Sequence, residues 1–273
     1  MIETITEMMS HLFIQRAVLV GSLISLCAAL LGVCLVLKRY SMIGDGLSHV
    51  GFGVLTVATA FGIATPLYIA IPCVAISAIL LLKIDNKSKI KSDSAIALIS
   101  SSALAIGVAV TSLTTGMNTD VCNFMFGSIL AMSKTDVYLS IAVSIIVLIL
   151  YIIYYRKIFI VTFDEEFAKA NGLKANKYTN IIAVLSALII VIGMRMMGVM
   201  LISSIIIFPA LTSMRIFKSF KKVIISSAII SISSFLIGIY LSYLYNISTG
   251  AMIVIVNLVL FILFTIIDKI IHE

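Results

Sequence analysis

Residues 12–37 read LFIQRAVLVGSLISLCAALLGVCLVL, a long apolar run in which only Gln15 and Arg16 are strongly polar. An α-helix rises 1.5 Å per residue, so about 20 apolar residues cross a hydrocarbon core about 30 Å thick. Comparable runs recur along the whole chain. The candidate membrane helices are residues 12–37, 42–63, 66–84, 94–115, 137–155, 178–195, 197–214, 222–243 and 250–267. We therefore expect an all-α, polytopic integral membrane protein with about 8–9 transmembrane helices, in a single transmembrane domain over residues 1–273.

The composition excludes other classes of protein. Of the 273 residues, 62% are hydrophobic and 11% charged, whereas a soluble domain has about a quarter charged residues. A transmembrane β-barrel would show alternating segments of about ten residues, and none is present. A net charge of +7 could suit nucleic acid, but the basic residues fall in short loops and are not interleaved with exposed aromatics. We expect a membrane protein that binds no nucleic acid.

The basic residues also predict an orientation. With the N-terminus outside, every lysine and arginine except Arg16, Lys134 and Arg195 falls in or near a cytoplasmic loop. Loops rich in Lys and Arg stay in the cytoplasm. We therefore expect the N-terminus outside and the C-terminal DKIIHE inside.

Three segments depart from simple spans. Residues 116–136 (GMNTDVCNFMFGSILAMSKTD) hold an apolar stretch too short to cross, which favours a re-entrant or interfacial segment on the outer face. Arg195 lies between two apolar halves, which indicates a tight outer turn or a broken helix. Pro209 lies inside the following span, where a proline frees a backbone carbonyl and predicts a kink.

The most unusual stretch is KRYSMIGDGLSHVGFG, residues 38–53, because Asp45 and His49 lie within an expected span. An ionisable group in a membrane costs at least about 2.5–3.5 kcal/mol, and such groups usually line a pathway. Residues four apart share one helix face, and carboxylate with imidazole suits Zn²⁺ or Mn²⁺. Two ligands are too few for a closed site, so we expect a second copy of the chain to supply the other two.

Other interpretations of this pair stay open. Asp45 follows Lys38 and Arg39 closely, so it could cap a helix or pair with a lysine at the membrane interface. Asp and His also form proton relays, which would suit a proton- or ion-coupled secondary carrier acting without an ATPase.

The longest charged segment is TFDEEFAKANGLKANK, residues 162–177. Asp164, Glu165 and Glu166 are favourable at a helix N-terminus, and Asn171-Gly172 is typical of a helix end. We expect a short amphipathic helix on the cytoplasmic membrane surface.

The chain lacks the chemistry of an enzyme. It contains no G-x-x-x-x-G-K-[ST] motif to bind nucleotide phosphates, and no constellation of nucleophile and base. ATP-driven transport would therefore need a separate ATPase chain.

Five stretches in this order resemble the membrane permease subunits of zinc and manganese ABC importers. They are KRYSMIGDGLSHVGFG, FMFGSILAMSKTDV, FDEEFAKANGL, MMGVMLISSIIIFPALTS and YNISTGAMIVIV. The resemblance implies that Asp45 and His49 are the intramembrane metal ligands. It also implies that the Glu165–Gly172 region docks on the ATPase, with Glu166, Ala168 and Gly172 matching an E-x-A-x-x-x-G coupling signature.

The same resemblance implies the partners and the cargo. Such permeases work in the bacterial cytoplasmic membrane as homodimers, with two ATPases and an extracytoplasmic metal-binding protein. The metal is transported cargo, and no permanently bound cofactor is expected. The form GDGLSHVGFG favours Zn²⁺ over Mn²⁺, and a related permease for chelated iron stays an alternative.

Overall fold

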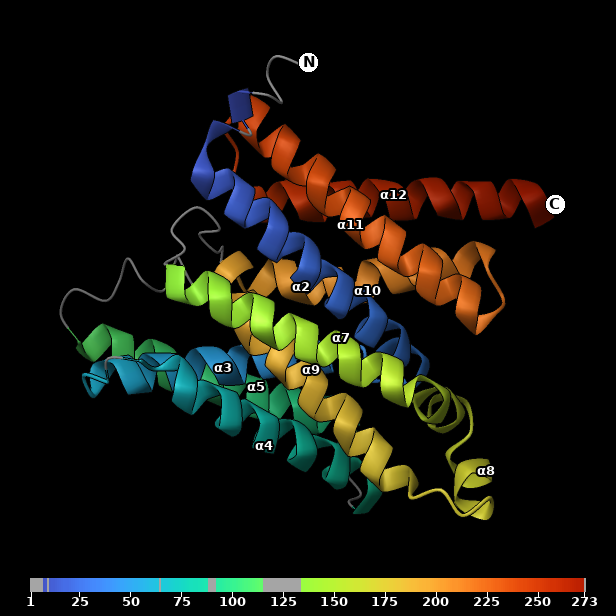
Figure 1. Ribbon diagram of the computed structural model, residues 1–273. Coiled ribbons are helices and arrows are strands. Elements are labelled where there is room, and N and C mark those ends of the chain that lie inside the picture. The colour runs from blue at the N-terminus through green and yellow to red at the C-terminus, as the bar shows by residue number, and fades with distance from the viewer. Residues whose placement is uncertain (1–6, 9, 64, 88–91, 115–133, 273) are drawn as a thin grey trace.

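The computed structural model describes residues 7–8, 10–63, 65–87, 92–114 and 134–272, and these contain nine long helices and one short helix (Figure 1). The long helices are α2 (Leu12–Leu37), α3 (Ile43–Ala60), α4 (Leu67–Lys87), α5 (Ser92–Leu113), α7 (Lys134–Phe163), α9 (Ala175–Met197), α10 (Val199–Ile216), α11 (Phe220–Tyr245) and α12 (Thr249–His272). The short helix is α8 (Glu165–Ala170). Each long helix matches one predicted range, and no strand occurs in the described ranges. The all-α prediction is confirmed.

Length and hydropathy make this a polytopic membrane protein. Seven helices, namely α2, α5, α7 and α9 to α12, are long and apolar enough to cross a membrane, and α4 contributes a shorter apolar stretch, Leu67–Leu82. Helix α3 is not one of these seven, and it contains Asp45, His49 and four glycines. Most of the predicted outer segment, residues 116–133, lies outside the described residues.

One end of the molecule collects the basic side chains. Helix α7 runs beside α2, where the Cys34 Sγ lies 3.7 Å from the Tyr151 Oη. Helix α11 also packs on α2, where the Ser231 hydroxyl donates to the Ser25 carbonyl over 2.9 Å. These helices bring Lys38, α8 and the start of α11 to the same end, called here the Lys38 end (Figure 1). The basic residues at this end are Lys38, Arg39, Arg156, Lys157, Lys169, Lys174, Lys177, Arg215, Lys218, Lys221, Lys222 and Lys269.

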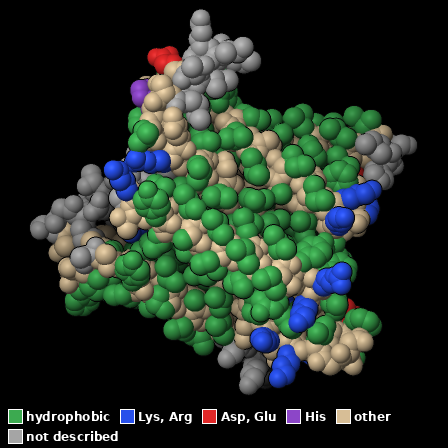
Figure 2. Space-filling model, in the orientation of Figure 1, with side chains coloured by type: hydrophobic (Ala, Val, Ile, Leu, Met, Phe, Trp, Pro, Cys, Tyr) green, Lys and Arg blue, Asp and Glu red, His purple; other side chains and the backbone are tan. Residues whose placement is uncertain are grey.

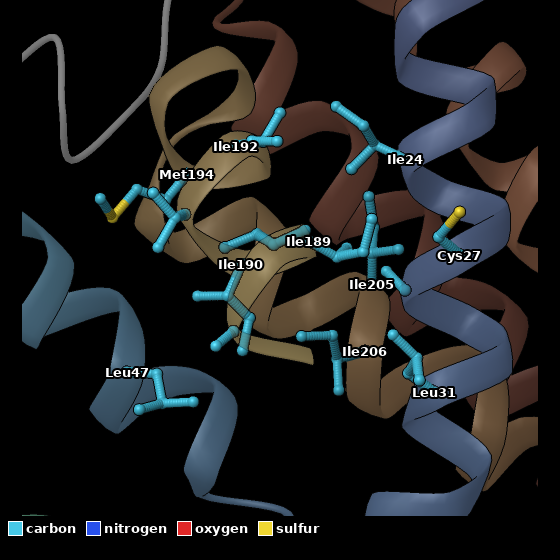
Figure 3. Close-up of a cluster of buried hydrophobic side chains, with 14 of the residues drawn as sticks. Ile24, Cys27, Leu31, Leu47, Ile189, Ile190, Ile192, Met194, Ile205 and Ile206 are labelled. Carbon is cyan, nitrogen blue, oxygen red and sulfur yellow. The ribbon is translucent and has the colours of Figure 1, made fainter. Parts of the chain in front are cut away.

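The core lies where α2, α9 and α10 meet. Ile24 from α2, Ile189 from α9 and Ile205 from α10 are buried and belong to one hydrophobic cluster, in which Ile189 extends toward Ile205 (Figure 3). Helices α2 and α10 approach closely at Gly32, where an added Cβ would collide with the carbonyl oxygen of Ile206. Two of these helices, α9 and α10, also pack against α3, where Met194 lies near Gly51 and Ile206 near Gly44.

The two irregular positions fall where the sequence placed them. Helix α9 ends at Met197 and α10 begins at Val199, so Gly198, with φ of 90°, forms the expected tight turn. Arg195 lies just before this turn, and its Nη2 is 3.4 Å from the Asp136 Oδ1. Pro209 is buried inside α10, which continues past it to Ile216. The kink at Pro209 stays a prediction.

Candidate metal site and coupling helix

Helix α3 holds Asp45 and His49 in its first two turns, at the Lys38 end. Leu47 lies between them in the sequence and is completely buried in the core (Figure 3). Residues two apart are about 200° apart around a helix. Asp45 and His49 therefore point away from the core that contains Leu47, and they share one face of α3.

The two side chains are near each other without forming a hydrogen bond. The His49 Nε2 lies 3.6 Å from the Asp45 Oδ2, and the side chains are 18% and 40% exposed respectively. Two ligand atoms at a tetrahedral metal with bonds of about 2.1 Å are about 3.4 Å apart. The pair is thus spaced to hold one metal ion between them.

The other histidine nitrogen lacks a partner. The His49 Nδ1 is buried and has no hydrogen-bond partner among the described residues. A buried polar atom without a partner is costly, and a metal-ligating histidine normally uses its second nitrogen to fix the ring.

The capping interpretation of Asp45 finds no support in this geometry. Met42 is the N-cap of α3 and makes no side-chain capping hydrogen bond. Among the described residues, the ion pair of Asp45 is with His49, whereas Lys38 pairs with Glu165. No group of three or more His, Cys, Asp or Glu side chains forms a metal site within the described ranges. One chain therefore offers two ligands at this place.

Close packing against α5 holds α3 in position. A Cβ added to Gly53 would lie 2.6 Å from the carbonyl oxygen of Ala103, and one added to Gly46 would lie 2.6 Å from the Ile96 side chain. At Gly53 the backbone of α5 leaves no room for a Cβ, and at Gly46 the Ile96 side chain occupies that space. Asp45 and His49 therefore lie on a helix whose position is restricted by its close packing against α5.

Helix α8 confirms the predicted short helix within residues 162–177. The Asp164 carboxylate is its N-cap and accepts a hydrogen bond from the Phe167 N–H over 2.8 Å. Ala168 is fully buried, against a small cluster that includes Val161 and Tyr178. Gly172 has φ of 76°, a conformation that favours glycine. The signature residues Ala168 and Gly172 therefore have structural reasons for their identity.

The outer face of α8 is open. Glu166 is highly exposed, and Phe167 has 57% of its surface exposed. A large aromatic side chain on an exposed surface marks a candidate contact for a partner protein. The buried Ala168 faces the membrane helices, and the opposite face offers charge and an aromatic ring.

Lys38 is a residue that the sequence analysis did not assign to this region. Its Nζ donates to the Glu165 Oε2 over 3.1 Å and to the Thr179 Oγ1 over 3.0 Å, and its side chain is only 8% exposed. Lys38 thereby joins α8 and α9 to the short loop that leads into α3. Its partners are more than 120 residues away in the sequence, so no local pattern could reveal the contact.

The charge of Lys38 alters the titration of Glu165. Partial burial alone would raise the pKa of the Glu165 carboxyl, but the hydrogen bond and charge of Lys38, together with Lys169, lower this pKa below its usual value of 4.5. Glu165 is therefore ionised in its contact with Lys38 at neutral pH.

Comparisons with known proteins cover nearly the whole chain. The sequence profile of the ABC 3 transport family matches residues 10–268. The manganese import system permease protein ScaB of Streptococcus gordonii is 32% identical, over 92% of this chain and 89% of that protein. The high-affinity zinc uptake system membrane protein ZnuB of Haemophilus influenzae is 32% identical, over 90% and 94%. The solved structure of PsaBC from Streptococcus pneumoniae in complex with Fab superposes with a TM-score of 0.86 at 30% identity, over 97% of this chain and 95% of that one.

Proposed function

The chain belongs to the ABC 3 transport family, and on that premise we propose that it is the permease subunit of an ATP-driven importer of a divalent transition-metal ion. The observation that carries the proposal is the Asp45–His49 pair, whose Nε2 and Oδ2 atoms lie 3.6 Å apart on a partly exposed face of α3. Relatives are named for manganese as well as for zinc. Both ions stay candidates, and the preference for Zn²⁺ rests on the sequence alone.

A second copy of the chain would complete the metal site. Exposed ionisable groups facing lipid would be costly, whereas two copies related by a two-fold axis would bring together two carboxylates and two imidazoles. The partly exposed side chain of Asp45 supports this arrangement. The metal is then cargo that passes between the two chains as they alternate between outward and inward access.

A separate ATPase would drive this alternation through α8. The exposed Glu166 and Phe167 form the contact surface, and Asp164, Ala168 and Gly172 fix the helix that presents them. Lys38 links α8 to the loop before α3 through its contact with Glu165. A displacement of α8 would therefore be transmitted through this loop to the start of α3, where Asp45 lies.

The charge distribution supports an orientation in the bacterial cytoplasmic membrane. The Lys38 end collects twelve described basic residues, and we assign it to the cytoplasm. The C-terminal end of α12 then lies inside and the start of α2 outside. An extracytoplasmic metal-binding protein would deliver the ion at the outer end, and residues 1–273 would act as one permease domain.

Two other functions, a secondary carrier and a permease for chelated iron, are less consistent with these observations. A secondary carrier would transport without an ATPase, and membership of an ABC family argues against it. A permease for chelated iron would not need bare metal ligands, and the Asp45–His49 spacing argues against that function.

Metal uptake into proteoliposomes tests the proposal. The permease is reconstituted with its ATPase and binding protein, and ATP-dependent uptake of Zn²⁺ and Mn²⁺ is measured for the wild type, Asp45→Ala and His49→Ala. We expect both variants to lose uptake while the complex still assembles. Unchanged uptake of both metals in both variants would refute the ligand assignment.

A further inference from the structure

A groove between α7 and α9 lies outside both sites described above. It has a volume of about 720 Å³. Its lining comes from α7 (Leu150 and Tyr154), from Lys174, the N-cap of α9, and from α9 itself (Asn176, Lys177, Asn180, Ile181, Val184 and Leu185). This volume falls within the range of about 300–1,000 Å³ that is typical of ligand sites. The groove opens on the outer surface of the helix bundle, so its occupant need not displace any helix.

The groove is divided into a polar mouth and an apolar floor. Lys174, Asn176 and Lys177 lie at the start of α9, at the Lys38 end, whereas Ile181, Val184 and Leu185 lie deeper along the helix. From Lys174 to Leu185 the helix rises by about 16 Å. That is roughly half of a hydrocarbon core about 30 Å thick. The groove therefore spans the depth of one membrane leaflet.

The mouth of the groove is positively charged. Lys174 and Lys177 are exposed, and neither forms an ion pair with a described carboxylate. Lys157 adds a third cation, because its Nζ lies 5.4 Å from the centre of the Tyr178 ring at the same end of α7 and α9. The lining contains no acidic residue. Figure 2 shows lysine and arginine side chains gathered over these helix ends.

From these observations we propose that the groove binds an anionic phospholipid of the cytoplasmic leaflet. Its phosphate lies at Lys174 and Lys177, and one acyl chain lies along Ile181 and Val184. Lysine ammonium groups at this depth attract anionic headgroups, and the apolar floor provides the surface that an acyl chain buries. The ATPase is a less suitable occupant because a water-soluble protein would not reach side chains buried at the depth of a leaflet.

Native mass spectrometry of the purified full-length protein tests the proposal. The protein is titrated in detergent with dioleoyl phosphatidylglycerol, with dioleoyl phosphatidylcholine, and with soluble glycerol phosphate. We expect the anionic lipid to be retained, and the zwitterionic lipid and the soluble anion to bind much more weakly. Equal retention of the two lipids, or displacement of the anionic lipid by glycerol phosphate, would overturn the proposal.

Matched variants locate the binding. The double variant Lys174→Gln/Lys177→Gln should weaken retention of phosphatidylglycerol about 30-fold. Val184→Phe should also weaken it, because the larger side chain fills the apolar floor without a change of charge. The control Lys221→Gln/Lys222→Gln removes the same charge from the same end but outside the groove, and should leave retention unchanged. If the control variant lost as much retention of phosphatidylglycerol as Lys174→Gln/Lys177→Gln, the effect would be due to net charge, and binding in the groove would be refuted. Release of the lipid on addition of the ATPase subunit would assign the groove to that partner instead.

Discussion

Replacement of Lys38 tests whether α8 is held by a single buried ion pair. In Lys38→Met, the methionine keeps most of the alkyl stem but loses the ammonium group that contacts Glu165 and Thr179. The Glu165 carboxylate, whose side chain is 29% exposed, then keeps only the Lys169 Nζ at 3.5 Å. Helix α8 would lose its ion pair with Lys38 and keep the packing of Ala168 against Val161 and Tyr178.

The expected cost follows from the burial of the two partners. Removing one partner from a buried ion pair costs about 3–5 kcal/mol, but partial exposure and Lys169 reduce the penalty here. We expect about 2 kcal/mol, which corresponds to about a 30-fold change in an opening equilibrium. The loss should be local, because α8 contacts little besides α7 and α9.

Hydrogen exchange of the α8 amides measures this opening. Exchange over Glu165–Ala170 should be about 30-fold faster in Lys38→Met than in the wild type, with little change in α2. The matched control is Lys169→Met, which breaks exposed pairs at 2.8 and 3.5 Å and should speed exchange by no more than about fivefold. Equal protection of α8 in Lys38→Met and the wild type would refute the reasoning.

Three further predictions concern α8 and the packing of α2. The pKa of Glu165 is lowered from 4.5 in the folded protein, so its contribution to the protection of α8 should be present above the unfolded pKa of 4.5 and be lost progressively as the pH falls from there through the folded pKa. A pH series of hydrogen exchange checks this, and protection that falls already at pH 6 would contradict it. Gly172→Ala should lower the free energy of opening of α8 by about 1 kcal/mol because φ is positive at this position. Hydrogen exchange of the α8 amides measures this loss, and unchanged protection would contradict the prediction. Gly32→Ala should lower thermal stability by about 1–3 kcal/mol, because its Cβ meets the backbone of Ile206. Gly44→Ala, which meets only the Ile206 side chain at 3.2 Å, is the control for that thermal measurement, and equal losses would contradict the packing argument.

Local patterns predicted most of the helices and the two ends of α8. Hydropathy predicts each long helix because the bilayer requires about 20 apolar residues per crossing, and α2 spans residues 12–37 as expected. Asp164 and Gly172 mark α8 because capping is a local interaction. The helix spacing also placed Asp45 and His49 on one face of α3.

Contacts between distant segments could not be predicted in this way. The Lys38–Glu165 pair joins residues 127 positions apart, and the Arg195–Asp136 pair likewise depends on how α9 packs against α7. The direction in which Asp45 and His49 face relative to the core became clear only with the buried position of Leu47. The chain that would complete the metal site is a proposal that neither the sequence nor the fold of one chain determines.

The stoichiometry of bound metal tests the central claim most directly. Purified permease is equilibrated by dialysis with Zn²⁺ or Mn²⁺, and the bound metal per chain is measured for the wild type and for His49→Ala. If two chains share one site built from both Asp45–His49 pairs, the wild type binds one ion per two chains and His49→Ala binds none. One ion per chain, or undiminished binding in His49→Ala, would contradict the account.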